Sequence, residues 1–148
     1  MTNKKSKGFT IIELLVVIAI IAVLAAIVLV NVTGYINQGK NSAIKANLAT
    51  VMTNGAVFYD QNSNYTGYCA SVNFTAPSAA ITAAGGTAVC DANAGNTAWC
   101  SCSTLKTTSA DIAGSTFCVD STGYKKVTQN AGACAARCVT PDNGVCID

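Results

Sequence analysis

Hydrophobic residues divide the chain into stretches with different spacing, and the first stretch is almost continuous. Phe9–Val32 is apolar at every position except Thr10, Glu13 and Asn31, and Leu14–Val30 is unbroken. An α-helix of this length extends about 36 Å at 1.5 Å per residue, which is enough to cross the hydrocarbon core of a bilayer. The pattern therefore predicts a membrane-spanning helix near the N-terminus.

After Asn31 the apolar side chains recur at intervals of three and four residues, which is typical of one face of an amphipathic helix. They are Ile44, Leu48, Val51, Met52, Gly55, Phe58 and Tyr59. We therefore predict one nearly continuous helix from Phe9 to Asp60, and a turn over Asp60–Tyr65 that ends it. Its second half should dock on the rest of the chain.

The remaining chain favours short strands joined by turns. The segment from Tyr65 to Ala98 is rich in Ala, Gly, Thr and Asn, which predicts a long loop with little regular structure. Three strands are predicted at Ala98–Leu105, Ser115–Val119 and Tyr124–Thr128, with Asp120–Gly123 as a hairpin connection and a turn-like segment from Asn130. The fold class is therefore α+β, with a small antiparallel sheet.

Eight cysteines lie in the second half of the chain and none precedes them, at Cys69, Cys90, Cys100, Cys102, Cys118, Cys134, Cys138 and Cys146. An even number in a small, loop-rich region predicts a disulfide framework formed outside the cytoplasm. The alternative is a zinc site. The spacings Cys100-x-Cys102 and Cys134-x3-Cys138 differ from the C-x2-C pairs of common zinc sites.

Disulfides also have a structural reason here, because the head is poor in large apolar residues. Only 16 of the 86 residues from Ser63 to Asp148 are Leu, Ile, Val, Met, Phe, Tyr or Trp, and so small a core is marginally stable alone. We expect Cys69 to pair with Cys90. The remaining expected bonds join Cys100 or Cys102 to Cys118, and Cys134 or Cys138 to Cys146. Cys100 and Cys102 share a strand face and should have separate partners.

Charge is unevenly distributed. Lys4, Lys5 and Lys7 precede the apolar helix, and the remaining chain has six basic and seven acidic residues. Basic residues on the N-terminal side alone predict a cytoplasmic N-terminus and an extracytoplasmic head. A net charge of −1 outside the N-terminal lysines gives no indication of a nucleic-acid partner.

No arrangement of residues indicates catalysis or a cofactor. The chain has no histidine, no nucleophile motif, no glycine-rich phosphate loop and no C-x-x-C redox motif, so we expect no enzyme. Asp60, Asn62 and Asn64 alternate as in cation-binding loops but lack the spacing and final Glu of an EF-hand. They are weak calcium candidates, and solvated turn residues are the favoured reading. Trp99 and Tyr124 are expected in the core or at its rim.

The segment Lys7-Gly8-Phe9-Thr10-Ile11-Ile12-Glu13 resembles the prepilin processing motif of type IV pilins and type II secretion pseudopilins. The resemblance implies cleavage between Gly8 and Phe9 by a prepilin peptidase and N-methylation of Phe9. It also implies a long helix packed on a small antiparallel sheet. Many family members have a proline late in this helix, where Val30 stands here.

Four segments follow from the pattern and the resemblance together. They are a leader at 1–8, a membrane or filament-core helix at 9–32, an amphipathic helix at 33–61 and a cysteine-rich head at 62–148. The implied partners are copies of the chain and related pilins, the prepilin peptidase, an inner-membrane assembly platform and membrane lipid. After assembly, the filament would reach the cell surface or span the periplasm.

Glu13 needs an explanation, because a charge inside a bilayer costs roughly 2.5–3.5 kcal/mol on insertion scales. In the family the corresponding Glu is thought to pair with the α-amine of a neighbouring subunit, here on Phe9. Two opposite charges 4 Å apart attract by about 4 kcal/mol at an effective dielectric near 20. Glu13 would then favour polymer over monomer. The alternative is a carboxylate that snorkels at the membrane edge.

Other readings of the N-terminus stay open. A secretory signal peptide could be cut near Leu24-Ala25-Ala26, although Glu13 and the length of the run disfavour it, and a plain signal anchor has similar features. A pilus subunit is the favoured function and a secretion pseudopilin the second. A monomeric, membrane-tethered binding module is the alternative from a different class.

Overall fold

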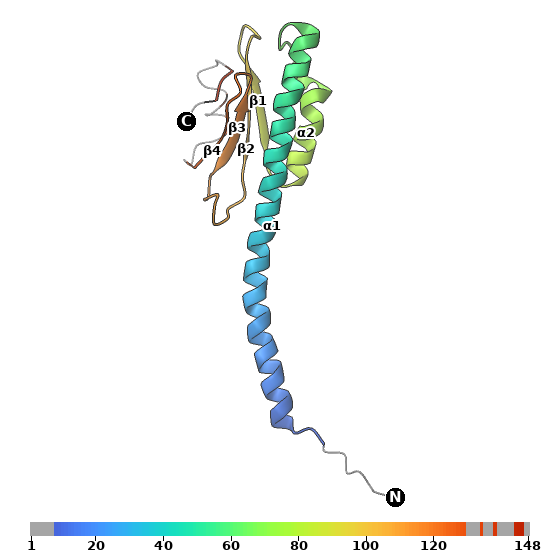
Figure 1. Ribbon diagram of the computed structural model, residues 1–148, viewed down its shortest axis with the longest axis vertical. Helices are drawn as coiled ribbons and strands as arrows, with labels where there is room; N and C mark the ends of the chain where they lie inside the picture. The colour runs from blue at the N-terminus through green and yellow to red at the C-terminus, as the bar shows by residue number, and fades with distance from the viewer. Residues whose placement is uncertain (1–7, 130–133, 135–137, 139–143, 147–148) are drawn as a thin grey trace, which may run out of the picture. The chain divides into compact units, whose positions relative to one another are not determined.

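The computed structural model describes residues 8–129, 134, 138 and 144–146. The predicted leader, apart from Gly8, and most of the predicted turn-like segment from Asn130 lie outside the described residues. The elements in chain order are α1 (Ile11–Asn62), a 3-10 helix η1 (Tyr68–Ala70), α2 (Val72–Ala83), and the strands β1 (Ala88–Ala92), β2 (Trp99–Thr104), β3 (Thr116–Asp120) and β4 (Lys125–Thr128) (Figure 1). The chain forms two units, Met1–Tyr35 and Ile36–Asp148, which we describe separately.

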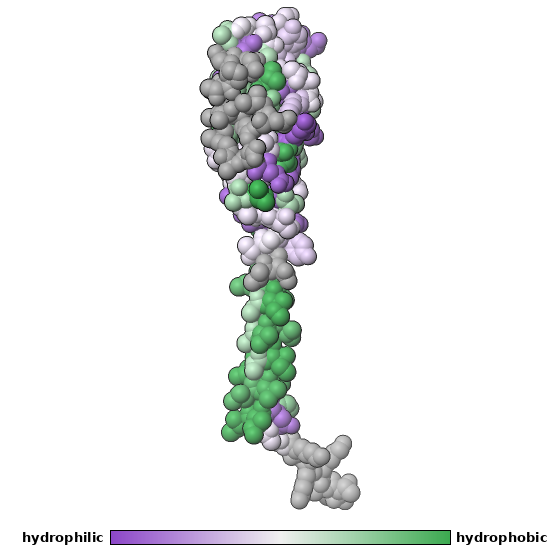
Figure 2. Space-filling view, turned by 90° about the vertical axis from the view of Figure 1, so that its left-hand side faces the viewer, coloured by the Kyte–Doolittle hydropathy of each residue, from purple (hydrophilic) through white to green (hydrophobic). Residues whose placement is uncertain are grey.

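The first unit contains the N-terminal part of α1, and its apolar side chains are exposed. The exposed fraction is 83% at Ile11, 46% at Val17 and 73% at Leu29, so the described residues leave this surface uncovered. Figure 2 shows the apolar residues as an almost unbroken band along this unit. By length and composition the helix is able to cross a membrane.

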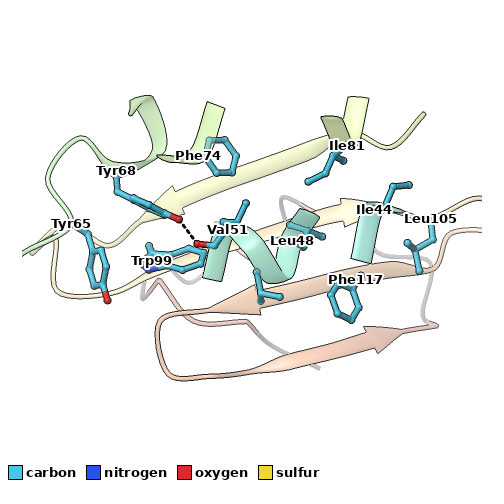
Figure 3. Close-up of a cluster of buried hydrophobic side chains, with 11 residues drawn as sticks. Ile44, Leu48, Val51, Tyr65, Tyr68, Phe74, Ile81, Trp99, Leu105 and Phe117 are labelled. Atoms are coloured by element: carbon cyan, nitrogen blue, oxygen red, sulfur yellow. Dashed lines mark hydrogen bonds between the residues drawn. The ribbon is translucent and has the colours of Figure 1, made fainter. Parts of the chain in front are cut away.

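The second unit is α+β, as predicted. Its four strands form one antiparallel sheet in the order β1-β2-β3-β4, in which each strand pairs with the next along the chain. All three predicted strands are present within one residue of their expected ends, and β1 adds a fourth strand at one edge. The second half of α1 and α2 pack with one face of this sheet around a single apolar cluster (Figure 3).

The cluster joins α1 to the sheet and to α2. Ile44, Leu48 and Val51 of α1 are fully buried, as predicted from their spacing. The other members are Tyr65, Tyr68, Phe74, Ile81, Trp99, Leu105, Phe117 and Val119. The Tyr68 hydroxyl donates to the Val51 carbonyl at 2.5 Å, and burial raises the pKa of Tyr68 well above its ordinary value. Trp99 is a core residue, which confirms the prediction.

The opposite face of the sheet is covered as well. In the β2–β3 register Cys102 lies opposite Cys118, and Cys100 lies opposite Asp120. These side chains point away from α1, because successive residues of a strand alternate between the two faces. They form a second buried cluster with Cys134, Cys138 and Cys146. β2 is therefore buried at its first five positions although the sheet is antiparallel.

The loop predicted from Tyr65 to Ala98 is wrong, because this segment contains η1, α2 and β1. Phe74, Pro77 and Ile81 of α2 are buried at positions i, i+3 and i+7, a helical spacing hidden among small residues. Pro77 lies inside the helix, where its missing N–H leaves the Asn73 carbonyl without its helical donor. The Asn54 side chain of α1 donates to that carbonyl at 2.7 Å.

The disulfides confirm part of the predicted pairing. Cys69 bonds Cys90, and Cys100 and Cys102 have separate partners, as expected. The bond from Cys100 or Cys102 to Cys118 is wrong, and so is the bond from Cys134 or Cys138 to Cys146. The observed bonds are Cys100–Cys138, Cys102–Cys134 and Cys118–Cys146. The prediction paired sequence neighbours, whereas the C-terminal cysteines meet the outer face of the sheet.

Candidate functional site

The N-terminus of α1 is closed by a reciprocal pair of hydrogen bonds between Thr10 and Glu13. The Thr10 backbone N–H donates to Glu13 Oε2 at 2.8 Å, and the Glu13 N–H donates to Thr10 Oγ1 at 3.2 Å. The Thr10 hydroxyl also donates to Oε2 at 2.7 Å. This is a capping box, in which Thr at the N-cap and Glu three residues later satisfy two unpaired donors of the helix end.

The capping box was not part of the sequence reading, although the signal was present. Thr10-Ile11-Ile12-Glu13 has the Thr-x-x-Glu spacing that defines the motif. From the sequence, however, Glu13 was interpreted only as a charge that pairs with a neighbouring subunit. The two roles are compatible in geometry. Among the described residues, all hydrogen bonds to the Glu13 side chain reach Oε2, so Oε1 is open to a second partner.

Gly8 and Phe9 lie before the helix begins and are both exposed. The exposed fraction of Phe9 is 79%. A Cβ placed on Gly8 would meet no described atom within 4 Å, so the described residues leave room for a side chain at this position. An exposed, non-helical peptide bond is the form that a peptidase can bind in an extended conformation.

One side of the helix in the first unit carries a shallow groove lined only by apolar side chains. Its lining residues are Leu15, Val16, Ala19, Ile20, Val23 and Leu24, which recur at helical spacing along one face. A surface of this kind is stable in lipid or against another apolar helix, and the helix association seen in membranes favours small residues such as Ala19 at the contact.

In the head, the loop between β2 and β3 is fastened to α1 by buried polar groups. Asn41 accepts from the Lys106 N–H at 2.7 Å and donates to the Lys106 carbonyl at 2.7 Å. Its amide also donates to Asp111 at 2.9 Å, and Lys45 forms an ion pair with Asp111 at 3.1 Å. Because Asn41 is only 2% exposed, these bonds fix the loop rather than bind solvent.

The weak calcium candidates lie at the end of α1 and in the bend after it. Asn62 donates to the Phe58 carbonyl at 2.9 Å. Asn64 donates to the Asn62 carbonyl and accepts from the Thr66 N–H. These two side chains thus make local bonds that end the helix, and Asp60 is exposed. No cluster of three or more His, Cys, Asp or Glu able to hold a metal ion occurs among the described residues.

Comparisons with known proteins match both the N-terminal segment alone and most of the chain. Residues 3–29 match the family model described as the prokaryotic N-terminal methylation motif. Over 72 residues the chain is 35% identical to the type IV major pilin protein PilA of Myxococcus xanthus, covering 49% of this chain and 33% of that protein. It is 27% identical to the type IV wide pilus major component PilA4 of Thermus thermophilus over 142 residues, covering 96% of this chain and 87% of that one.

The chain is similar to type IV pilins, through the N-terminal motif and through a longer match that covers most of its length. No solved structure matches it, and the match to the Myxococcus pilin spans about a third of that protein's length. The motif model ends at residue 29, within the apolar part of α1.

Proposed function

We propose that the chain is made as a prepilin, cut between Gly8 and Phe9, methylated on the new N-terminus, and assembled through α1 into a type IV pilus-like filament. The observation that carries the proposal is the N-terminus of α1. There a capping-box carboxylate stands at the start of the part of α1 in the first unit, where the large apolar side chains are about half or more exposed.

The exposed apolar surface identifies the kind of partner. Burying apolar surface is favourable by about 25 cal/mol per Å², so a helix with this surface must lie in lipid or against other apolar helices. Membrane lipid fits the chain before assembly, and copies of the chain or related pilins fit it afterwards. A prepilin peptidase and an assembly platform in the inner membrane complete the set of proposed partners.

Cleavage would give Glu13 a charged partner. The new α-amine lies on Phe9, one residue before the Thr10 N–H that donates to Glu13 Oε2. With Oε2 held in the cap, Oε1 has no hydrogen bond from the described residues and would accept from the amine of a neighbouring subunit. Methylation leaves the amine positive, so this ion pair survives the modification.

The proposed division of the chain follows from this life cycle. The leader, 1–8, stays on the cytoplasmic side, 9–32 crosses the membrane and then forms the filament core, and 33–61 carries the head, 62–148, outside the membrane. The four disulfides support an extracytoplasmic head, because disulfides persist in oxidising compartments. The filament would then project from the surface or span the periplasm.

A pilus is the favoured filament, with a secretion pseudopilus as the alternative. Both relatives named above are pilus components by name, and the longer match extends through the head. A monomeric tethered module would not need cleavage, so N-terminal processing separates it from either filament subunit.

The test is intact-mass measurement and N-terminal sequencing of the protein from native membranes, purified without reductant. We expect a chain that begins at Phe9, carries one added methyl group, and has lost two hydrogen atoms for each of four disulfides. A chain that retains Met1, or one that starts near Ala26, contradicts the proposal and favours a tethered module or a secreted domain.

The matched control is Gly8→Leu. A bulky side chain at the cleavage point should block close approach of the peptidase and leave the leader attached. Gly8 lies before α1, and a Cβ there would meet no described atom within 4 Å, so the variant head should fold normally. Cleavage of Gly8→Leu at the wild-type rate would show that the motif is not the processing site.

A further inference from the structure

Six cysteines form a single buried cluster on the outer face of the sheet. Cys100, Cys102 and Cys118 come from β2 and β3 and are fully buried. Their partners, Cys138, Cys134 and Cys146, are 1–5% exposed. The three disulfides belong to one cluster of buried residues, so a different pairing among the same six sulfur atoms can be considered.

The sheet brings one alternative pair, Cys102 and Cys118, next to each other. Cys102 and Cys118 are direct partners in the β2–β3 register, so their side chains lie side by side on one face. Opposed residues in an antiparallel pair have Cα atoms about 4.5–5.5 Å apart, and disulfides form at Cα separations of roughly 4.4–6.8 Å. A Cys102–Cys118 bond therefore fits the sheet without displacing a strand.

That alternative bond also closes a shorter loop than the observed bonds. Cys102–Cys134 and Cys118–Cys146 join residues 32 and 28 positions apart, whereas Cys102 and Cys118 are neighbours in one hairpin. The entropic cost of loop closure increases with loop length. The β2–β3 hairpin alone would therefore favour Cys102–Cys118, and something else must favour the observed pairing.

Asp120 supplies that preference. It is fully buried and lies two residues after Cys118, on the same face of β3. Its Oδ1 accepts from the Thr122 N–H, the Thr122 hydroxyl and the Tyr124 N–H at 2.7–3.1 Å, which builds the turn between β3 and β4. Its Oδ2 accepts from the Cys146 N–H at 2.9 Å, which holds Cys146 beside Cys118.

We propose that the head has a second disulfide arrangement containing Cys102–Cys118, and that Asp120 selects the observed one by fixing Cys146. In the second arrangement Cys134 bonds Cys146, and Cys100–Cys138 is unchanged. Exchange breaks Cys102–Cys118 and Cys134–Cys146 and forms Cys102–Cys134 and Cys118–Cys146. No electrons are gained or lost.

The exchange requires a nucleophilic thiol as catalyst. A catalyst thiolate attacks Cys102 and releases the Cys118 thiolate, which then attacks Cys146 and releases the Cys134 thiolate. Cys134 finally attacks Cys102 in the mixed disulfide, and the catalyst leaves as the thiolate that entered. The partner of stated chemistry is therefore a thiol–disulfide isomerase, or glutathione in vitro, rather than an oxidant. Such a partner would restore the observed pairing in a head where the β2–β3 hairpin had first formed Cys102–Cys118.

The first test uses Cys146→Ser in the full chain, purified oxidised in detergent. One cysteine is then left without a partner. If Cys118 attacks the Cys102–Cys134 bond, the free thiol moves to Cys134, and alkylation followed by peptide mass spectrometry locates it. We expect the free thiol on Cys134 in at least a tenth of the molecules. A free thiol on Cys118 alone would overturn the proposal.

The second test compares Asp120→Asn with wild type at equilibrium in a glutathione buffer. The Asn carbonyl can still accept the three turn bonds, but its NH₂ group cannot accept from the Cys146 N–H. We expect the ratio of Cys102–Cys118 to Cys118–Cys146 to increase about tenfold, which corresponds to about 1.4 kcal/mol.

Asp111→Asn is the matched control, because Asp111 is also buried in the head but bonds Asn41 and Lys45, outside the cysteine cluster. It should leave the ratio as in wild type. An unchanged ratio in Asp120→Asn, or an equal increase in both variants, would show that Asp120 does not select the pairing.

Discussion

In the second unit, the size of a single residue can be set by a residue of another element that packs against it. Gly55 is the clearest case. It is buried on α1, and a Cβ at this position would lie 2.6–2.7 Å from three atoms of the Trp99 ring. Trp99 is fully buried, so the helix or the ring would have to shift to accommodate a Cβ at Gly55. Glycine is present because only a residue without a side chain lets the helix approach this ring.

We expect Gly55→Ala to lower the free energy of unfolding by about 1–3 kcal/mol, the usual cost of overpacking a core. This reverses the gain of about 1 kcal/mol that alanine normally brings to a helix interior. Denaturant unfolding of the full chain in detergent, followed by the fluorescence of the single tryptophan, measures the effect. Gly39→Ala on the same helix, where a Cβ meets nothing, should stabilise instead. Equal effects at the two positions would contradict this packing argument.

The bond from Asn54 to the Asn73 carbonyl compensates for Pro77, and a double-mutant cycle can test this. In the wild-type background, Asn54→Ala should lower the free energy of unfolding by about 0.5–1.5 kcal/mol, the net value of a typical hydrogen bond. In a Pro77→Ala background, the restored N–H can bond the Asn73 carbonyl, so the same change should cost less. Additive effects in the cycle would show that the two residues are not coupled.

At the scale of elements, α1 combines two tasks at one residue. Glu13 caps the helix through Oε2 and, in the proposed filament, pairs with an amine of a neighbouring subunit. The cap makes Glu13 useful to the isolated chain as well, because unpaired N–H groups at a helix end need an acceptor. A simple loss-of-function substitution would therefore not separate the two tasks.

Two substitutions do separate them. Glu13→Gln keeps an acceptor for the Thr10 N–H and removes the charge, so we expect normal helix formation and loss of filament assembly. Thr10→Val removes the hydroxyl of the cap and keeps the charge; it should cost about 0.5–2 kcal/mol of helix stability and leave assembly largely intact. Sheared-filament yield and circular dichroism of the membrane fraction give the two readouts. A sheared-filament yield of Glu13→Gln equal to that of wild type would contradict the ion-pair hypothesis.

At the scale of the whole molecule, the disulfides compensate for a small apolar core. Three of them attach the C-terminal cysteines to the outer face of the sheet, and the fourth, Cys69–Cys90, joins η1 to β1. This fourth bond is independent of the buried six-cysteine cluster, so its contribution can be measured alone.

Replacing both Cys69 and Cys90 by Ser should lower the free energy of unfolding by about 3 kcal/mol, given the length of the loop that the bond closes. For the second unit, Ile36–Asp148, that is a decrease of about 13 °C in Tm. The three other disulfides should still form, which peptide mapping without reductant checks. Loss of the native pairing in the cluster would show that the two disulfide groups fold together.

The sequence alone determined those features that depend on local pattern. The apolar run predicted the exposed helix of the first unit. An aliphatic stretch of bilayer length can be covered by lipid, so it does not depend on contacts within the chain. The three-and-four spacing of Ile44, Leu48 and Val51 fixed the face of α1 that docks on the head. The motif around Gly8 and Phe9 indicated the likeness to type IV pilins, since it is a contiguous string of residues.

The tertiary structure decided whatever depends on residues far apart in the chain. α2 was missed because its buried face has only Phe74, Pro77 and Ile81 among small residues, and it is stable through contact with α1 and the sheet rather than through its own pattern. The disulfide pairing likewise depends on residues that are far apart in the chain and meet on one face of the sheet. Register placed Cys102 opposite Cys118, yet both bond cysteines near the C-terminus, because the buried carboxylate of Asp120 holds the Cys146 backbone beside that face.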